Sequence, residues 1–341
     1  MDNTRIQDGT QGKGRSVVDT GTGRPWLVLA ILFGVAVLNY IDRTLLSILQ
    51  VPIKEELGLS DAQLGALTGL AFAIFYTTLA VPVARLADRA VRKSVISASI
   101  LVWSAMTAMT SLAQNFAILV FLRIGVAVGE AGSVPASHSM ISDLFPIHRR
   151  ASALAAWGMS YPVGTMLGFA LGGWLAANIG WRDAFFWIGM VGVVGAPLFL
   201  LLVREPTRGR YDPPAQSRDE PPPTLEALRH LWNLRCFRSL ALAGALSAYV
   251  QNVMLAWNAP FYSRVHDLPL ADIAQWLALI NGLGSALGIT LGGHLSDRLG
   301  RRFTKGYLIA PAVGMLLLGP IGVVQYAVAP VTLSLLLGIV C

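Results

Sequence analysis

Four charged residues lie inside long apolar stretches of this 341-residue chain. Asp42 and Arg43 are neighbours in one stretch, and Arg123 and Glu130 lie in another. A charged side chain at the centre of a bilayer costs about 2.5–3.5 kcal/mol on insertion scales, and such residues generally line ion or substrate pathways. The four charges sum to zero, so we expect these side chains to pair with one another.

The spacing of these residues favours a proton or substrate relay. Arg123 and Glu130 are seven positions apart, which places them on one helical face, about 10 Å apart along the axis. Burial favours the neutral form of a carboxyl group, whereas a nearby arginine favours the charged form. We therefore expect Glu130, with Asp42 as the second candidate, to take up a proton when its pairing with Arg123 breaks. The alternative is a static ion-pair network that locks the two helices together.

These side chains must be held by helices that cross a membrane. A crossing helix needs about 20 mostly apolar residues, and a bilayer offers no water to the backbone of an open sheet. The sequence contains nine such runs and a tenth that reaches the last residue. The predicted spans are 26–48, 61–83, 93–113, 115–139, 151–177, 183–203, 238–263, 271–295, 304–325 and 328–341.

Composition excludes several classes of protein. The chain is 54% hydrophobic and 13% charged, with a mean hydropathy of +0.59. Soluble domains carry about 25% charged residues, so a soluble globule is excluded, as is a long disordered protein. Two cysteines exclude a disulfide scaffold, and five scattered histidines make a structural zinc site unfavourable. The sequence lacks the phosphate-binding loop, zinc-protease and serine-hydrolase motifs, so we expect no ATP-driven pump, enzyme, cofactor or metal.

Basic residues gather in the loops on one side of the predicted membrane. These loops and the N-terminal tail hold 21 of the 26 Lys and Arg, and the opposite loops hold Lys54, Arg182 and Arg264. The positive-inside rule then puts the N-terminus in the cytoplasm. The net charge of +7 is explained by this topology, so we expect no nucleic-acid partner. The sequence predicts a multi-pass protein of the cell (inner or plasma) membrane.

A loop pattern occurs twice. Residues 84–93 and 293–302 share the order Asp-Arg-x-x-basic-basic, 209 positions apart, each after the second helix of a predicted half. Two halves of this kind are a known transporter architecture. The predicted domains are a cytosolic tail (1–25), an N-terminal half (26–203), a proline-rich cytosolic linker (204–237) and a C-terminal half (238–341). We expect a short surface helix at 224–231, and a bundle truncated in its tenth span.

These motifs resemble the major facilitator superfamily. The second loop, Gly-x-x-x-Asp-Arg-x-Gly-Arg-Arg, matches the loop signature of that family fully, whereas the first has Ala84 and Val91 in place of glycines. The segments 39–43, 123–132 and 143–150, together with Gly-Trp-Arg at 180–182, are similar to the bacterial spinster-like group. The resemblance covers residue 25 to the end of the chain.

The resemblance implies an all-α, two-half bundle that works as a secondary active transporter by alternating access. In spinster-like carriers the positions of Asp42, Arg123 and Glu130 are linked to proton coupling and gating. The implied substrate is a small organic anion, for which Arg43 and Arg123 are natural partners, or an amphiphilic lipid-like solute. Expected partners are this substrate, protons and the lipid bilayer, with the protein as a monomer. The alternative is a non-transporting membrane sensor on the same fold.

Further polar residues are candidates by position. A repeat of glycines at 164, 168 and 172 predicts close helix packing rather than a site. The cavity candidates are Asn39, Tyr40, His138, Tyr161, Tyr249, Gln251, Asn252, Asn258 and Asn281. The candidates for a cytoplasmic gate are Asp88, Arg89, Arg92, Lys93, Asp143, Arg149, Arg150, Asp297, Arg298, Arg301 and Arg302.

Overall fold

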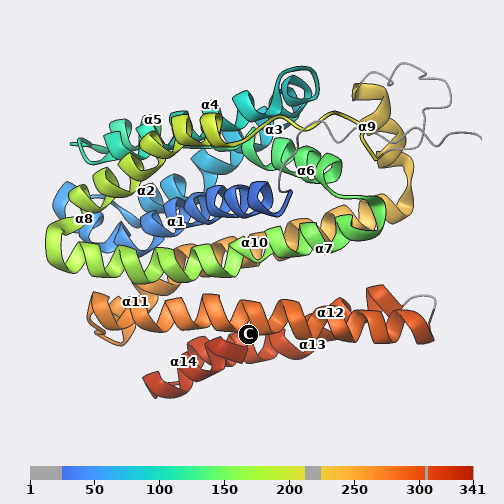
Figure 1. The fold of residues 1–341 in the computed structure, drawn as a ribbon. Helices are drawn as coiled ribbons and strands as arrows, with labels where there is room; N and C mark the ends of the chain where they lie inside the picture. Colours follow the sequence, from blue (N-terminus) through green and yellow to red (C-terminus); the bar gives the residue numbers. More distant parts are fainter. Residues whose placement is uncertain (1–24, 212–223, 304–305, 341) are drawn as a thin grey trace, which may run out of the picture.

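The computed structural model describes residues 25–211, 224–303 and 306–340. Within these ranges the chain is helical and contains no strand (Figure 1), so the prediction of an all-α fold is confirmed. Nearly all of the predicted tail and the centre of the predicted linker, at 212–223, lie outside the described residues.

The helices follow the predicted spans closely. The first part of the chain forms α1 (Pro25–Leu57), α2 (Asp61–Gly65), the π-helical turn η1 (Ala66–Leu70), α3 (Ala71–Arg89), α4 (Arg92–Thr110), α5 (Phe116–Glu130), α6 (Ser133–Leu144), α7 (Ile147–Gly158) and α8 (Ser160–Leu202). The second part forms α9 (Thr224–Asn233), α10 (Arg235–Val265), α11 (Leu270–Leu279), the π-helical turn η2 (Ile280–Gly284), α12 (Ser285–Arg302), α13 (Gly306–Ala327) and α14 (Val331–Val340). Helix α9 is the short helix expected at 224–231, inside the predicted linker.

Six stretches of the described residues are long and apolar enough to cross a membrane. They are 25–57, 61–79, 116–144, 147–202, 235–265 and 270–302. The stretch 147–202 has 56 residues, more than twice the length of about 20 that one crossing needs. It reverses direction at Gly180, which has φ 84° and ψ 165°, a conformation that glycine adopts without steric cost. Two predicted spans therefore share this stretch.

The glycine repeat of α8 packs against α1, as the sequence predicts. A Cβ atom added to Gly164 would lie 2.6 Å from Cβ of Tyr40, and one added to Gly168 would lie 2.8 Å from Cβ of Thr44. Small residues let the two backbones approach closely, which is the main attraction between helices in lipid. This contact fixes α1 and therefore the positions of the charged residues that it carries.

The helices of the two predicted halves meet mainly through two pairs. Helix α1 packs against α10, and α8 packs against α11. In Figure 1, α11–α14 lie below the group formed by α1–α8, and α9 lies at the right-hand end. Contacts between the two predicted halves include Gln50 Nε2 of α1, which donates to the carbonyl oxygen of Ala256 of α10, and the close approach of Ala274 of α11 to Gly173 of α8.

Candidate functional site

The four intramembrane charges come together between α1 and α5. Glu130 is fully buried and Asp42 is 2% exposed, while the side chain of Arg43 keeps 26% of its exposure. Asp42 and Arg43 lie on α1, and Arg123 and Glu130 lie on α5. The structure therefore brings the four predicted residues together as two arginine–carboxylate pairs, Arg43 with Glu130 and Arg123 with Asp42.

Arg43 holds one oxygen of Glu130. Its Nε and Nη2 lie 2.7 Å and 2.6 Å from Oε2 of Glu130. The other oxygen, Oε1, is buried and has no hydrogen-bond partner among the described residues. A buried polar atom without a partner is costly, so such an atom in a native structure requires an explanation. The two oxygens of Glu130 therefore have different surroundings in this structure.

Arg123 turns to Asp42 instead. Its Nη1 lies 3.5 Å from Oδ2 of Asp42, a long contact, and its Nε is buried without a partner among the described residues. The hydroxyl of Thr107, on α4, donates to Oδ1 of Asp42. Asp42 is therefore held from two helices, whereas Arg123 is held only loosely.

The expected pairing of Glu130 with Arg123 is wrong for this structure. The two residues share a helix, and about 10 Å of rise separates them at 1.5 Å per residue. A neighbouring helix can present an arginine directly opposite the carboxylate, and α1 does so with Arg43. The spacing of Arg123 and Glu130 indicated that both lie on one face of a helix, but it did not identify the arginine that pairs with Glu130.

Aromatic rings surround Arg43. The guanidinium carbon of Arg43 lies 4.9 Å from the ring centroid of Phe72, 5.0 Å from that of Tyr76 and 5.9 Å from that of Tyr40. Tyr40 also meets Tyr161 edge to face at 5.1 Å, so both of these predicted cavity residues belong to the site. Phe72, Tyr76 and Thr107 were missed by sequence reasoning. Phe72 and Tyr76 lie four positions apart on one predicted span, and this spacing was the sequence signal that could have identified them.

The regular hydrogen bonding of the predicted fourth span is interrupted directly after Glu130. Helix α5 ends at Glu130, and α6 begins at Ser133, so the predicted fourth span consists of two helices. Gly129 lies against Trp103 of α4, where an added Cβ atom would come within 2.9 Å of the Cβ of Trp103. Ala131 and Gly132 keep right-handed helical φ and ψ, so α5 and α6 continue as one membrane stretch, and the irregular turn between them lies beside the charged cluster.

The remaining cavity candidates divide into three groups. Asn39 is buried on α1 near the cluster. His138 is exposed and meets the Trp157 ring edge to face at 4.7 Å, which makes it a helix contact. The side-chain amides of Asn252 and Asn281 each donate to the backbone oxygen four residues earlier, and Gln251 is exposed.

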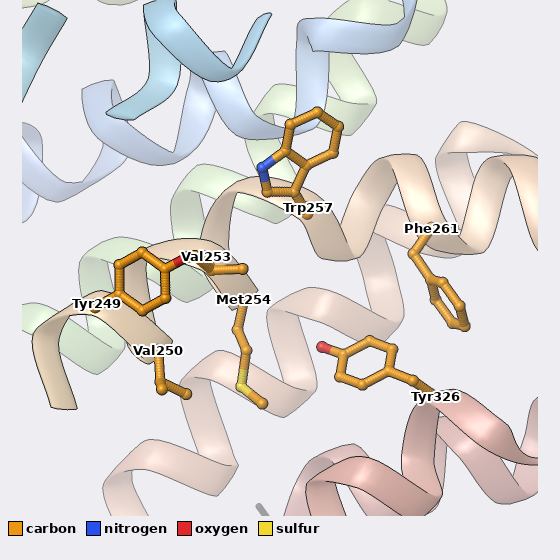
Figure 2. A pocket seen from close by; sticks show the side chains of 7 residues that line it. All are labelled: Tyr249, Val250, Val253, Met254, Trp257, Phe261 and Tyr326. Carbon is orange, nitrogen blue, oxygen red and sulfur yellow. The ribbon is translucent and has the colours of Figure 1, made fainter. Parts of the chain in front are cut away.

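Tyr249 lines a separate pocket, and Asn258 contacts another residue of its lining. Figure 2 shows this pocket, with a volume of about 380 Å³, lined by Tyr249, Val250, Val253, Met254, Trp257 and Phe261 of α10 and by Tyr326 of α13. Asn258 Oδ1 accepts a hydrogen bond from the Tyr326 hydroxyl at 2.5 Å. The lining is almost entirely apolar, so the pocket suits an apolar group and not a charge.

The first loop of the repeat holds a buried ionic network. Arg92 is 1% exposed and contacts Asp143, while its Nε donates to Oε1 of Glu205 at 2.7 Å. The backbone N–H groups of Lys93 and Gly209 donate to Glu205 at 2.8 Å and to Asp143 at 3.0 Å. Arg92 and Asp143, both predicted gate residues, are therefore joined within the first eight helices. Glu205 was not among the predicted gate residues.

The other gate candidates are less engaged. The side chains of Asp88 and Arg89 lie outside the described residues. Arg149 is exposed, and Arg150 donates to the carbonyl of Ser142 at 2.8 Å. The four gate candidates on α12, Asp297, Arg298, Arg301 and Arg302, are all exposed, and the three arginines border a hollow of about 480 Å³.

A group of ion pairs between residues far apart in the sequence lies at the end of the helices opposite the first loop of the repeat. Asp61 Oδ1 accepts from Lys54 Nζ at 2.7 Å and from Arg264 Nη2 at 2.8 Å, and Oδ2 accepts from Arg264 Nη1 at 3.1 Å. Asp61 follows the capping residue Ser60, whose side chain and backbone exchange hydrogen bonds with Gln63. We call Lys54, Asp61 and Arg264 the Asp61 clasp, which joins α1 and α2 to α10.

Comparison with known proteins agrees with this architecture. A sequence profile of the Major Facilitator Superfamily matches residues 32–341. An MFS-type efflux pump of Mycolicibacterium smegmatis is 33% identical over 311 residues, 90% of this chain and 71% of that protein. A probable L-galactonate transporter of Escherichia coli is 28% identical over 281 residues, 80% of this chain and 61% of that protein.

A solved structure shares the fold. The crystal structure of a bacterial homolog of the human lysosomal transporter spinster, in an inward-facing and unoccupied conformation, has a TM-score of 0.81 and 32% identity. The match covers 94% of this chain and 72% of that chain. The relatives are transporters and not enzymes, as the absence of enzyme motifs predicts.

Proposed function

Because this chain belongs to the major facilitator superfamily and is spinster-like within it, we propose that it is a proton-coupled secondary carrier that works by alternating access. Membership of the family makes it a multi-pass membrane transporter. The coupling ion, the substrate and the mechanism are the parts proposed here.

One observation carries the proton coupling. Glu130 is fully buried, its Oε2 takes both contacts from Arg43, and its Oε1 has no partner among the described residues. A proton on Oε1 neutralises the carboxylate and removes most of its attraction for Arg43. The guanidinium of Arg43 then becomes available to another anion.

Arg43 is the residue best placed to exchange partners. It is the only member of the cluster that keeps substantial exposure, 26% of its side chain. An arginine can bind a carboxylate or phosphate through two parallel hydrogen bonds, and in this structure two of its nitrogens are engaged by one oxygen of Glu130. We propose that substrate anion and the charged form of Glu130 compete for Arg43, so that proton uptake and substrate binding are coupled.

The proposed substrate is a small organic anion or an amphiphilic lipid-like solute. The arginine pair supports an anionic group, and the E. coli relative is named for an organic acid. The apolar pocket along α10 supports an apolar group on the same solute. Gln50 of α1 contacts Ala256 of α10. Arg43 lies seven residues before Gln50, and Tyr249 of the pocket lies seven residues before Ala256. Arg43 and the pocket therefore lie at similar depths along the two helices.

The contacts between the halves support an alternating-access cycle. The Asp61 clasp and the contact between Gly173 and Ala274 join them at the end away from α9. By contrast, α12 has no fully buried residue among those described. This pattern fits a carrier closed at the outer end, with the N-terminus in the cytoplasm as the loop charges predict.

The repeated loops are the proposed cytoplasmic gate. Asp88, Arg89, Asp297 and Arg298 would hold the cytoplasmic ends of the halves together when the carrier opens outward. Replacing Asp88 by Asn should then favour the inward-open state, measured as greater labelling of cysteines on the cytoplasmic side. Unchanged labelling would leave the loops as topology signals alone.

Transport driven by an imposed pH gradient tests the function. Sealed vesicles that contain the purified protein should accumulate radiolabelled L-galactonate or a fluorescent lysophospholipid when the two sides of the membrane differ in pH. A protonophore should abolish the accumulation. Absence of gradient-driven movement for either class of solute would favour the non-transporting sensor.

A further inference from the structure

Phe72 lies between the two arginines of the cluster. Its ring centroid is 4.9 Å from the guanidinium carbon of Arg43 and 5.5 Å from that of Arg123. Among the described residues, no other ring contacts both guanidinium groups. The ring face attracts cations, and the attraction is largest where water is excluded. Phe72 thus holds two like charges that belong to two different ion pairs.

The position of Phe72 depends on the π-helical turn before it. Phe72 is the second residue of α3, directly after η1, and it stacks on Tyr76 at 5.4 Å with 17° between the ring planes. A π-helical turn contains an extra residue, and each residue of a helix rotates the face by about 100°. Without η1, the face of α3 that carries Phe72 and Tyr76 would be rotated relative to the segment before it. The two rings would then no longer face Arg43.

The charges of the cluster allow a second pairing. Arg123 could turn along α5 toward Glu130, whose Oε1 has no partner among the described residues. The contact that opposes this change is long, 3.5 Å between Nη1 of Arg123 and Oδ2 of Asp42. That contact by itself is a weak restraint. The contact with the ring of Phe72 is a second restraint on Arg123.

We propose that Phe72 is a positioning residue that keeps each arginine of the cluster with its present carboxylate partner. Its ring holds Arg123 beside Asp42 and Arg43 beside Glu130, and so keeps a second arginine away from Oε1 of Glu130. Its effect on transport rests on the proposed function, but the pairing itself does not. The pairing can therefore be tested without transport.

A double-mutant cycle on thermal stability tests the contact directly. Phe72→Leu is made in the wild-type chain and in the neutral background Arg43→Gln/Glu130→Gln, which leaves no stranded charge. We expect the loss of Tm caused by Phe72→Leu to be smaller in the neutral background by about 2 °C or more. An equal loss in both backgrounds would show that Phe72 serves packing alone and would overturn the proposal.

Phe75→Leu is the matched control. Phe75 lies on the same helix, is 38% exposed and contacts no arginine among the described residues, so its replacement should give the same Tm change in both backgrounds. Should Phe72→Leu yield too little protein, Phe72→Met keeps the apolar volume and lacks the ring. Phe72→Tyr, which keeps the ring face, should restore wild-type behaviour.

The pH profile of flux provides the second measurement. In Phe72→Leu, Arg123 gains access to Oε1 of Glu130, and a second arginine favours the charged carboxylate. The pH midpoint of gradient-driven flux should move to lower pH by about 0.5 unit or more. An unchanged midpoint with reduced flux would count against the positioning role. A wild-type chain without any pH dependence would contradict the proposed function and leave the result of the stability cycle intact.

Discussion

Arg43 and Glu130, which are 87 positions apart in the chain, are joined through a single oxygen. Both Nε and Nη2 of Arg43 contact Oε2 of Glu130, at 2.7 and 2.6 Å, and Oε1 has no partner among the described residues. The two oxygens of this carboxylate therefore differ chemically. One oxygen contacts the arginine, and under the proposed function the other is the oxygen that takes the proton.

Replacing Glu130 by Gln should abolish proton coupling without unfolding the protein. Glutamine keeps the shape of the side chain and buries no charge, so it mimics the protonated form. Gradient-driven flux per folded molecule should fall roughly tenfold or more, and the residual flux should not vary with pH. The measurement is flux in vesicles across the range from mildly acidic to mildly basic pH. A wild-type pH profile in this variant would exclude Glu130 and leave Asp42 as the remaining carboxylate of the cluster.

Removing Arg43 should destabilise the protein at least as much as removing Arg123. Arg43→Ala strands Glu130, which is held by two short contacts, whereas Arg123→Ala leaves Asp42 with the Thr107 hydroxyl. Breaking a buried ion pair typically costs about 3–5 kcal/mol, and the partial exposure of Arg43 reduces this somewhat. Thermal unfolding in detergent measures the loss. Glu130→Gln should recover part of the stability of Arg43→Ala, and a failure to do so would contradict the pairing.

Charge reversal at the Asp61 clasp should open the end that it closes. Asp61→Arg places a positive charge beside Lys54 and Arg264, so the helices α2 and α10 should separate more often. A cysteine at Ala259, which is fully buried near this end of α10, should then react faster with a thiol reagent, in a chain whose native cysteines are replaced by serine. The double reversal Asp61→Arg/Arg264→Asp should restore slow labelling. Equal labelling in all three chains would show that the clasp does not hold the end closed.

Gly168→Ala should destabilise the contact between α8 and α1. The added Cβ atom would lie 2.8 Å from Cβ of Thr44 and 3.1 Å from Cα of Ile41, so one of the helices must move. Overpacking of this kind costs about 1–3 kcal/mol. Gly195→Ala on the same helix is the control, because nothing lies within 4 Å of its Cβ position, and it should be neutral or slightly stabilising. Similar Tm changes for the two variants would contradict the packing argument.

Much of the fold follows from the sequence because the bilayer imposes it. A run of about 20 apolar residues has one stable form in lipid, a helix, and the predicted spans agree with the helices to within a few residues at most ends. Helix α1 is longer than predicted, reaching Leu57, because the polar turns at its C-terminal end continue the helix past the apolar run. The glycines at 164, 168 and 172 likewise indicate a close helix contact, because small residues at this spacing form a flat stripe that a second helix can approach.

Pairing within the site required the tertiary structure. The sequence identified the four intramembrane charges, because each is costly in hydrocarbon and must be compensated. It did not identify which arginine meets which carboxylate, since this depends on how α1 and α5 are rotated against each other, and spacing along one helix carries no information about that rotation. Phe72, Thr107 and the Asp61 clasp were absent from the predicted site for the same reason. The sequence by itself determined the membrane spans, the repeat and the residues whose charge demands a partner; only the packing of the helices decided that Arg43 holds Glu130.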